Sequence, residues 1–406
     1  MMSKKSPQLR FEGFTDDWEE RKLGEVATLS SSKRIHLSDY VTEGIPFYRG
    51  SEISTGGITG NQELFISQEK FDEIKEKYGV PSEGDILVTA VGTLGNLWKV
   101  DSRRFYYKDG NLIQISKMQV NSDYLLTYFT GGIGKKRLLD SAAGSNQKAL
   151  TMVKMREITV DFPSEDEQQK IGSFFKQLDD TIALHQRKLD LLKEQKKGYL
   201  QKMFPKNGAK VPELRFAGFA DDWEEHKLGD YIIQYSEKTK QNNQYPVFTS
   251  SRNGLFFQKD YYKGNQIASE DNIGYNIVPR GYFTYRHMSD DLVFKFNIND
   301  LADYGIVSTL YPVFTTNEQL NSKYLQYQLN EGSEFRRFSL LQKQGGSRTY
   351  MYLNKLQNMI LNIPKLEEQQ KIGSFFKQLD DTIALHQRKL DLLKEQKKGF
   401  LQKMFV

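Results

Sequence analysis

The sequence predicts an α+β protein in which two mixed α/β domains are joined by two long antiparallel coiled-coil helices, arranged around a pseudo-twofold axis. Three observations support this prediction. Residues 167–204 return at 368–405 with a single change, from Tyr199 to Phe400. A shorter repeat opens each half of the chain, and the bodies that follow the two openers differ almost completely. The predicted boundaries are 1–162 for the first domain, 163–204 for the first helix, 205–211 for a linker, 212–363 for the second domain and 364–406 for the second helix.

The long repeat has the residue spacing of a coiled-coil helix. Mostly apolar residues recur in a 4-3 pattern, and charged residues such as Lys176 and Asp180 lie between them. At about 1.5 Å per residue the helix would be roughly 50 Å long, and it is most simply buried against its own copy. Long bodies between the copies favour an antiparallel pair, in which the two histidines are packed seam residues. The predicted seam consists of Ile171, Phe175, Leu178, Ile182, His185, Leu189, Leu192, Ile372, Phe376, Leu379, Ile383, His386, Leu390 and Leu393.

The start of the first long helix is signalled more clearly than that of the second. Ser164 and Glu167 have the spacing of a capping box, and Pro163 precedes them. The second copy follows Pro364 and has no serine at the equivalent place. Its cap must therefore be made by other groups.

The first body contains recognisable strands and one short helix. Residues 45–53 are typical of a strand entering a polar loop, and residues 71–79 of an amphipathic helix. Residues 84–100 predict two apolar strands around a turn at Gly92 and Gly95. A phosphate-binding loop is the alternative for this turn, but no helix pattern follows it, so a hairpin is favoured.

The second body shares only its frame with the first. It contains aromatic-rich segments such as residues 274–287 and is expected to mix strands with short helices. Both bodies end in similar polar stretches, residues 144–147 and 346–349, about twenty residues before the proline that precedes each long helix.

Composition excludes several classes of protein. The 406 residues include no cysteine and five scattered histidines, which excludes disulfides and a Cys/His zinc site, and no metal site is expected. The net charge is +5, and each long repeat contributes eight basic and five acidic residues, so the bodies are not basic overall. Without a signal-peptide pattern or a membrane span, the chain is expected to be cytoplasmic.

No catalytic residues are predicted. Methyltransferase, Walker A, HExxH and GxSxG motifs are missing. Gly134-Lys135 fails the P-loop pattern on both sides. Glu73 and Lys75 resemble part of a nuclease motif, but a solvated helix face is the better interpretation.

Basic and polar residues of the two bodies are the candidates for contact with DNA. Arginines and lysines interleaved with aromatics, as in residues 103–108, suit phosphate contact and base reading, although surface strands often have the same composition. The candidates are Arg49, Ser51, Thr93, Asn96, Arg103, Arg104, Lys108, Lys135, Lys136, Ser145, Gln147, Ser250, Arg252, Arg286, Arg336, Ser347 and Arg348.

The arrangement of the repeats resembles a known family. FPSEDEQQKIGSFF at Phe162, IPKLEEQQKIGSFF at Ile363, GDILVTAVGTLG at Gly84 and the opener ending in WEERKLGEV are similar to the specificity subunit of a Type I restriction-modification enzyme. The second body has no GDILV segment, and Pro279-Arg-Gly-Tyr282 stands near its expected place.

The resemblance implies two target recognition domains, each of which reads one half of a split site in double-stranded DNA. It also implies a non-catalytic chain that binds two modification subunits, which methylate adenine N6, and restriction subunits through them. This chain would bind no cofactor, whereas S-adenosylmethionine, ATP and Mg would be bound by the partners.

The residues fit this function independently, because a split site needs two different readers and two copies of one partner need matching docking surfaces. Two other classes remain open. A stand-alone pseudo-dimeric DNA-binding regulator would also need two readers, but it would not need identical exposed helix positions. A structural coiled-coil protein would need the seam alone.

Overall fold

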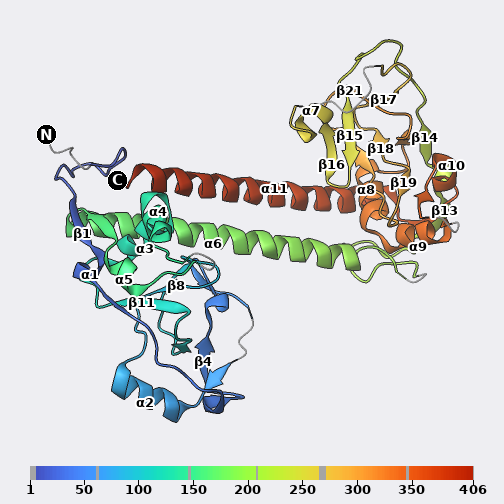
Figure 1. Ribbon diagram of the computed structural model, residues 1–406. Coiled ribbons are helices and arrows are strands. Elements are labelled where there is room, and N and C mark those ends of the chain that lie inside the picture. Colours follow the sequence, from blue (N-terminus) through green and yellow to red (C-terminus); the bar gives the residue numbers. More distant parts are fainter. Residues whose placement is uncertain are drawn as a thin grey trace. The chain divides into compact units, whose positions relative to one another are not determined.

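The computed structural model describes residues 6–60, 64–144, 148–206, 209–264, 271–343 and 347–405. The chain divides into two compact units, Met1–Arg187 with Arg388–Val406, and Lys188–Gln387. Each unit holds one α/β body and parts of two long helices, α6 (Glu165–Lys202) and α11 (Leu366–Lys403) (Figure 1). The predicted α+β class is confirmed. The predicted domain boundaries stay a prediction, since the two units divide both long helices.

The first body is built on two small sheets with strand orders β2-β11-β8-β9 and β10-β4-β7-β3. Strands β8 and β9 pair antiparallel, which confirms the hairpin predicted around Gly92. The predicted amphipathic helix is also confirmed, although it begins earlier, at Gln68. The elements are β1 (Glu19–Lys22), α1 (Leu23–Val26), β2 (Thr28–Ser30), η1 (Leu37–Asp39), β3 (Tyr40–Val41), β4 (Ile45–Tyr48), η2 (Gly50–Glu52), β5 (Ile53–Ser54), β6 (Gly57–Ile58), β7 (Phe65–Ile66), α2 (Gln68–Tyr78), β8 (Ile86–Thr89), β9 (Leu97–Lys99), β10 (Tyr106–Tyr107), β11 (Leu112–Ser116), α3 (Ser122–Thr130), α4 (Gly132–Asp140), α5 (Met152–Arg156) and β12 (Thr159–Phe162).

The second body repeats one sheet of the first, with order β14-β22-β18-β20. Strand β18 follows Pro279–Tyr282 and takes the place that β8 has in the first body; Gly84 and Gly281, just before these strands, both have positive φ, +92° and +84°. The elements are β13 (Glu224–Lys227), η3 (Leu228–Asp230), β14 (Ile232–Gln234), β15 (Phe248–Ser251), β16 (Gly254–Phe257), α7 (Gln258–Tyr261), β17 (Asn276–Pro279), β18 (Phe283–Thr284), β19 (Met288–Ser289), β20 (Asn297–Ile298), β21 (Tyr304–Val307), β22 (Val313–Thr316), α8 (Ser322–Glu331), α9 (Ser333–Leu341), β23 (Thr349–Tyr350), α10 (Leu353–Leu356) and β24 (Ile360–Ile363).

The opener of each half forms a strand that pairs with the strand just before the long helix. β1 pairs antiparallel with β12, and β13 pairs in the same way with β24, with Glu19 opposite Phe162 and Glu224 opposite Ile363. The long helices begin at equivalent places, Glu165 and Leu366. The two bodies are therefore attached to their helices by the same local frame.

Within each unit, parts of α6 and α11 pack side by side and antiparallel. In the first unit Asp179 pairs with Lys397, and in the second Asp380 pairs with Lys196. The aromatic contacts Phe174–Phe400 and Tyr199–Phe375 are related in the same way, with ring centroids 5.2 and 5.1 Å apart. Every predicted seam position is buried or half-buried, and both seam histidines are half-buried.

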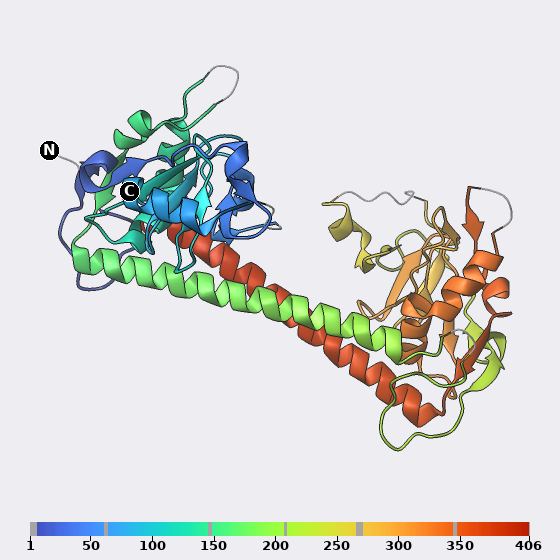
Figure 2. The ribbon, with the colours of Figure 1, turned by 90° about the horizontal axis from the view of Figure 1, so that it is seen from below.

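The end of each long helix completes a hydrophobic core. In the first unit Phe405 lies within 5.6 to 6.3 Å of the rings of Trp18, Tyr124, Tyr128 and Phe175. The last residues of α11 thus lie against the first body (Figure 2). In the second unit Phe204 takes the equivalent place. A core of one body is therefore closed by the helix that begins at the other body.

Candidate nucleic-acid interface

The EQQKIG motif fixes each body to its long helix. Both oxygens of the buried Glu167 accept hydrogen bonds from Arg10, at 2.8 and 2.7 Å, and Glu368 accepts two from Arg215 at 2.7 Å. The capping-box spacing did not predict this role for Glu167. The repeated arginine of the two openers was the available signal.

Two further residues of the motif are also used in this attachment. Gln168 accepts a hydrogen bond from the backbone N–H of Asn121, which caps α3, and donates one to the carbonyl of Pro163. A Cβ atom on Gly172 would lie 2.9 Å from the backbone nitrogen of Tyr124, so only glycine permits this approach. Packing inside each unit therefore explains the identity of the buried motif residues.

Packing does not explain the identity of the exposed helix positions. Leu184 and Leu385 are each 60% exposed, and Leu191 and Leu392 are each 47% exposed. Each stands two residues after a seam residue. In the first unit Leu184 and Leu392 lie at one level of the helix pair, five residues along each helix from the Asp179–Lys397 ion pair. The sequence pattern predicts a charged outer face and does not single out these leucines, although they stand in both copies.

In the first unit, the structure places Arg103 and Arg104 on an exposed loop. Arg103 forms hydrogen bonds with Asp101 and lies over the ring of Trp98, at 5.7 Å. The Asp101 contact raises the pKa of the Arg103 guanidinium. Arg104 donates to Gln68 and lies over the ring of Phe71. Both arginines are thus held in place by neighbours of the same body.

The other first-body candidates fall into two groups. Ser51, Thr93, Lys108, Lys135 and Lys136 are exposed. Arg49 binds Glu52 in the turn η2, and the half-buried Asn96 donates to the carbonyl of Ile53, so both stabilise loops. Ser145 and Gln147 lie outside the described residues.

In the second unit, three cations line one pocket of about 230 Å³. Arg252, Arg286 and Lys295 share this pocket with the hydroxyl-bearing side chains of Tyr261, Tyr262 and Tyr311, among others. Arg252 donates from both terminal nitrogens to Asp291, at 2.8 and 2.7 Å. Asp291 also accepts from Ser289, and these bonds lower the pKa of its carboxyl. A cationic concave surface of this kind suits a phosphate-rich ligand.

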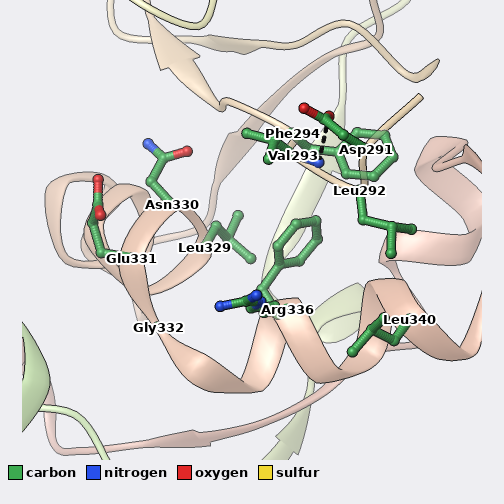
Figure 3. A pocket seen from close by; sticks show the side chains of 11 residues that line it. Asp291, Leu292, Val293, Phe294, Leu329, Asn330, Glu331, Gly332, Arg336 and Leu340 are labelled. Atoms are coloured by element: carbon green, nitrogen blue, oxygen red, sulfur yellow. Dashed lines mark hydrogen bonds between the residues drawn. The ribbon is translucent and has the colours of Figure 1, made fainter. Parts of the chain in front are cut away.

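A second pocket, of about 460 Å³, is lined in part by residues 291–294 (Figure 3). Arg336 on α9 lines it together with Asn330 and Glu331 from the end of α8. Ser347 and Arg348 immediately precede β23 and are exposed. Arg348 donates a hydrogen bond from Nε to Asp290 at 3.0 Å. Ser250 is buried and hydrogen-bonded to Asn297, so we leave it out of the proposed interface.

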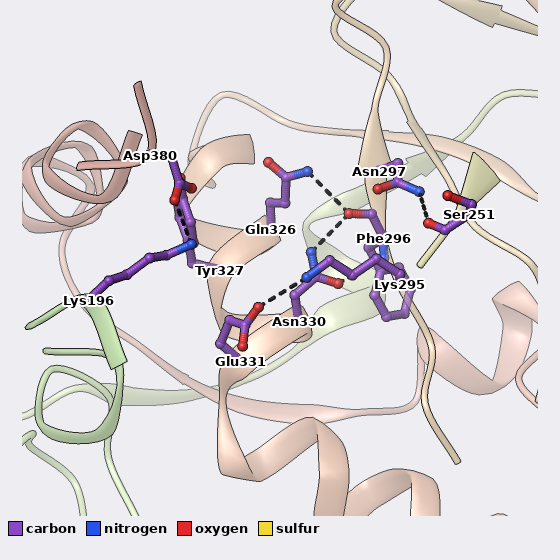
Figure 4. Close-up of polar contacts among 10 residues, drawn as sticks. All are labelled: Lys196, Ser251, Lys295, Phe296, Asn297, Gln326, Tyr327, Asn330, Glu331 and Asp380. Atoms are coloured by element: carbon purple, nitrogen blue, oxygen red, sulfur yellow. Dashed lines mark hydrogen bonds and ion pairs between the residues drawn. The ribbon is translucent and has the colours of Figure 1, made fainter. Parts of the chain in front are cut away.

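Polar contacts join the second body to the long helices within the second unit (Figure 4). Tyr327 on α8 donates to Asp380 on α11 at 2.7 Å, and Lys196 on α6 pairs with the same carboxylate at 2.6 Å. Lys295 is held by Glu331 at 3.0 Å, beside the cationic pocket. Asn297 donates to the carbonyl of Ser251, just before Arg252.

No group of three or more His, Cys, Asp and Glu side chains among the described residues could bind a metal ion. None of the helices in the described part of the chain combines the length and apolarity needed to cross a membrane.

Comparison with known proteins identifies the family. The model of the Type I restriction modification DNA specificity domain matches residues 15–194 and again 220–395. The chain therefore belongs to this family of DNA specificity proteins. The predicted resemblance is confirmed, and specificity subunits of this class are non-catalytic components of type I restriction-modification systems.

Particular relatives extend the match over most of the chain. The Type I restriction enzyme MjaVIII specificity subunit of Methanocaldococcus jannaschii is 21% identical, and the alignment covers 95% of this chain and 91% of that protein. A protein of Haemophilus influenzae assigned to the same class is 30% identical over 155 residues, which are 37% of this chain and 38% of that protein. The crystal structure of the S subunit from M. genitalium shares the fold, with a TM-score of 0.62, 12% identity and 99% coverage of both chains.

Proposed function

We propose that this chain reads a bipartite site in double-stranded DNA, one half with each body, and docks two adenine-N6 methyltransferase subunits, through which restriction subunits join. One observation carries the proposal: two different bodies are mounted on helices whose repeated residues, 167–204 and 368–405, match at every exposed position. Different bodies suit two different half-sites. Identical exposed positions suit two copies of one partner.

Each body has its own proposed reading residues. Arginine can form two hydrogen bonds with guanine in the major groove, and lysine suits phosphate contact. The proposed base-reading residues are Arg103 and Arg104 in the first body, and Arg252, Arg286 and Arg348 in the second. The chain itself would bind no cofactor, and the partners would bind S-adenosylmethionine, ATP and Mg. Its place of action would be the cytoplasm.

The bipartite site is tested by transplanting one body. Replacing residues 28–162 with residues 232–363 places a second copy of the second body on the first frame. We expect a methylated site that repeats the second half-site in inverted orientation, because the reader moves with its body. Methylome sequencing of cells that also express the partner subunits measures this. An unchanged site would contradict the proposal, and the reciprocal transplant is the control.

The docking surface is tested at the exposed leucines. We expect Leu184→Glu with Leu392→Glu to remove one methyltransferase copy, and the same change at Leu191 and Leu385 to remove the other. A carboxylate there would leave a charge buried against the partner. Native mass spectrometry counts the copies. Leu37→Glu, at an 89% exposed leucine of the first body, is the matched control.

Two results would decide against docking. Binding of two copies by the leucine variants would move the docking surface elsewhere. Sequence-specific DNA binding by a chain that co-purifies with no methyltransferase would favour the stand-alone regulator.

A further inference from the structure

Asp291 of the second body is fixed in a way that an ordinary surface carboxylate is not. Its side chain accepts four hydrogen bonds, two from Arg252, one from the Ser289 hydroxyl and one from the backbone N–H of Val293, the last drawn in Figure 3. The intervening Leu292 has a φ of +64°, which is unfavourable for a leucine. The turn therefore maintains an unfavourable backbone conformation while its carboxylate faces an exposed arginine.

The contact with Asp291 determines how Arg252 can meet another molecule. Both terminal nitrogens of Arg252 bind the carboxylate, and its Nε has no hydrogen-bond partner among the described residues. Arg252 comes from the turn between β15 and β16, 39 residues before Asp291 in the sequence. The pair therefore joins two separate segments and leaves one edge of the guanidinium for a ligand.

The neighbouring Asp290 does the same for a second arginine. It accepts from Nε of Arg348, whose two terminal nitrogens have no partner among the residues that the structure describes. Asp290 and Arg348 lie at one end of the ribbon in which β19 pairs with β23. Tyr350 and Tyr352 of the same segment stack with an interplanar angle of 13°. Two arginines from distant parts of the chain are thus presented by adjacent aspartates.

Two carboxylates on this surface would weaken binding to any DNA, because they repel phosphates. Discrimination between base pairs has a different requirement. An arginine that is already held in its reading orientation loses less conformational freedom on binding, and it cannot easily turn to a phosphate instead. Asp290 and Asp291 therefore suit a surface that selects among sequences at the expense of general affinity.

We propose that Asp290 and Asp291 are specificity-determining positioning residues, which hold Arg348 and Arg252 so that the remaining edge of each guanidinium reads a guanine. This inference rests on the proposed function of the second body. The aspartates themselves do not contact the base.

The test compares discrimination with affinity. The full chain, purified with the subunits that accompany it, is used to select a site from random duplex DNA. Dissociation constants are then measured at one salt concentration for the selected duplex, for duplexes altered at single base pairs, and for unrelated duplex DNA. We expect Asp291→Asn to reduce discrimination at one base pair by roughly ten- to hundredfold, while unrelated DNA binds more tightly.

Two further variants separate positioning from charge. Asp303→Asn removes a more exposed carboxylate, 86% against 51% for Asp291 and 68% for Asp290, that pairs with Arg280 elsewhere in the second unit. It should tighten binding to all duplexes alike and leave discrimination unchanged. Arg252→Lys keeps the charge but loses the two-pronged contact, and it should reduce discrimination at the same base pair as Asp291→Asn. Asp290→Asn should act at a different base pair.

The outcomes are distinct. If Asp290→Asn and Asp291→Asn change every affinity by the same factor as Asp303→Asn, the aspartates supply charge alone and the inference is overturned. If the unaltered chain shows no sequence preference, the proposed function fails first, and the inference fails with it. Circular dichroism of each variant establishes that it is folded.

Discussion

The two units solve the same packing problem with different residues. At equivalent positions of β12 and β24, opposite Glu20 and Glu225 of the opener strands, stand Asp161 and Asn362. Asp161 binds Arg137 of α4 at 2.6 Å, whereas Asn362 donates to Glu334 of α9 at 2.8 Å. The frame thus accepts different polar side chains at this position, a carboxylate in the first unit and an amide in the second.

The bodies can differ from each other while the frame stays constant. Each polar pair has both members inside one body, so a body can change as a whole without leaving a buried charge unpaired. The frame contacts, by contrast, join the opener to the long helix and are the same in both units. Arg10 with Glu167, and Arg215 with Glu368, are examples.

The largest effect is expected when the second half of the chain is removed. A chain ending at Lys210 should form a dimer, because its Met203 and Phe204 match the Met404 and Phe405 that close the core of the first unit. Sedimentation at about ten micromolar should show the dimer. Phe204→Asp in the same half-chain should be monomeric, since a carboxylate cannot enter that aromatic core. A monomeric unaltered half-chain would contradict the equivalence of the two helix ends.

The frame contacts should be equally important in both units. Arg10→Ala leaves the buried Glu167 without its ion-pair partner and should lower the free energy of unfolding of the first unit by about 3 to 5 kcal/mol. Arg215→Ala should do the same in the second unit. Denaturant unfolding, followed by hydrogen exchange in each unit, measures both. Lys22→Ala, at an exposed ion pair with Glu157, is the control and should lower the free energy of unfolding much less than Arg10→Ala does. Clearly unequal effects of Arg10→Ala and Arg215→Ala would show that the two frame contacts are not equivalent.

The body-specific pairs should not be interchangeable one residue at a time. Asp161→Asn removes the charge that Arg137 binds and should lower the free energy of unfolding of the first unit by about 1.5 to 3 kcal/mol. The reverse change, Asn362→Asp, brings a second carboxylate to Glu334 and should destabilise the second unit. Thermal unfolding of both variants checks this. If neither exchange lowers the unfolding temperature, the residue at this position is not specific to each body.

A smaller difference concerns how tightly the bodies contact the helices. Tyr327 of the second unit donates to Asp380, whereas the residue at the matching place on α3 of the first unit is Thr127, which donates to its own helix. Tyr327→Phe should lower the free energy of unfolding of the second unit by about 1 kcal/mol. This is a small effect for a hydrogen bond to a charged group, because Asp380 is partly exposed. Tyr199→Phe, which makes the two helix copies identical, should change stability by less than about 0.5 kcal/mol. Equal effects of the two variants would remove the contrast.

Much of the frame could be predicted because its segments, the opener and the long helix, are repeated in the sequence. The 4-3 spacing gave the seam, and Pro163 and Ser164 gave a helix start within one residue of Glu165. The pairs that hold the candidate arginines could not be found in this way. Arg252 and Asp291 are far apart in the sequence, have no periodic relation, and meet only when β15 and β19 have folded. The exposed leucines could not be singled out from the sequence, because single leucines are common on protein surfaces.

The crossed ends of the long helices have a consequence for synthesis. Leu401, Met404 and Phe405 belong to the core formed by residues such as Trp18 and Phe175, which leave the ribosome far earlier. At about 5 to 20 residues per second, the roughly 230 residues from Phe175 to Phe405 take some 12 to 46 s to make. During that time the aromatic pocket of the first unit is open to any matching helix end. A nascent neighbour that offers its own Met203 and Phe204 could occupy this pocket, so crowded translation of one message should favour mispaired chains.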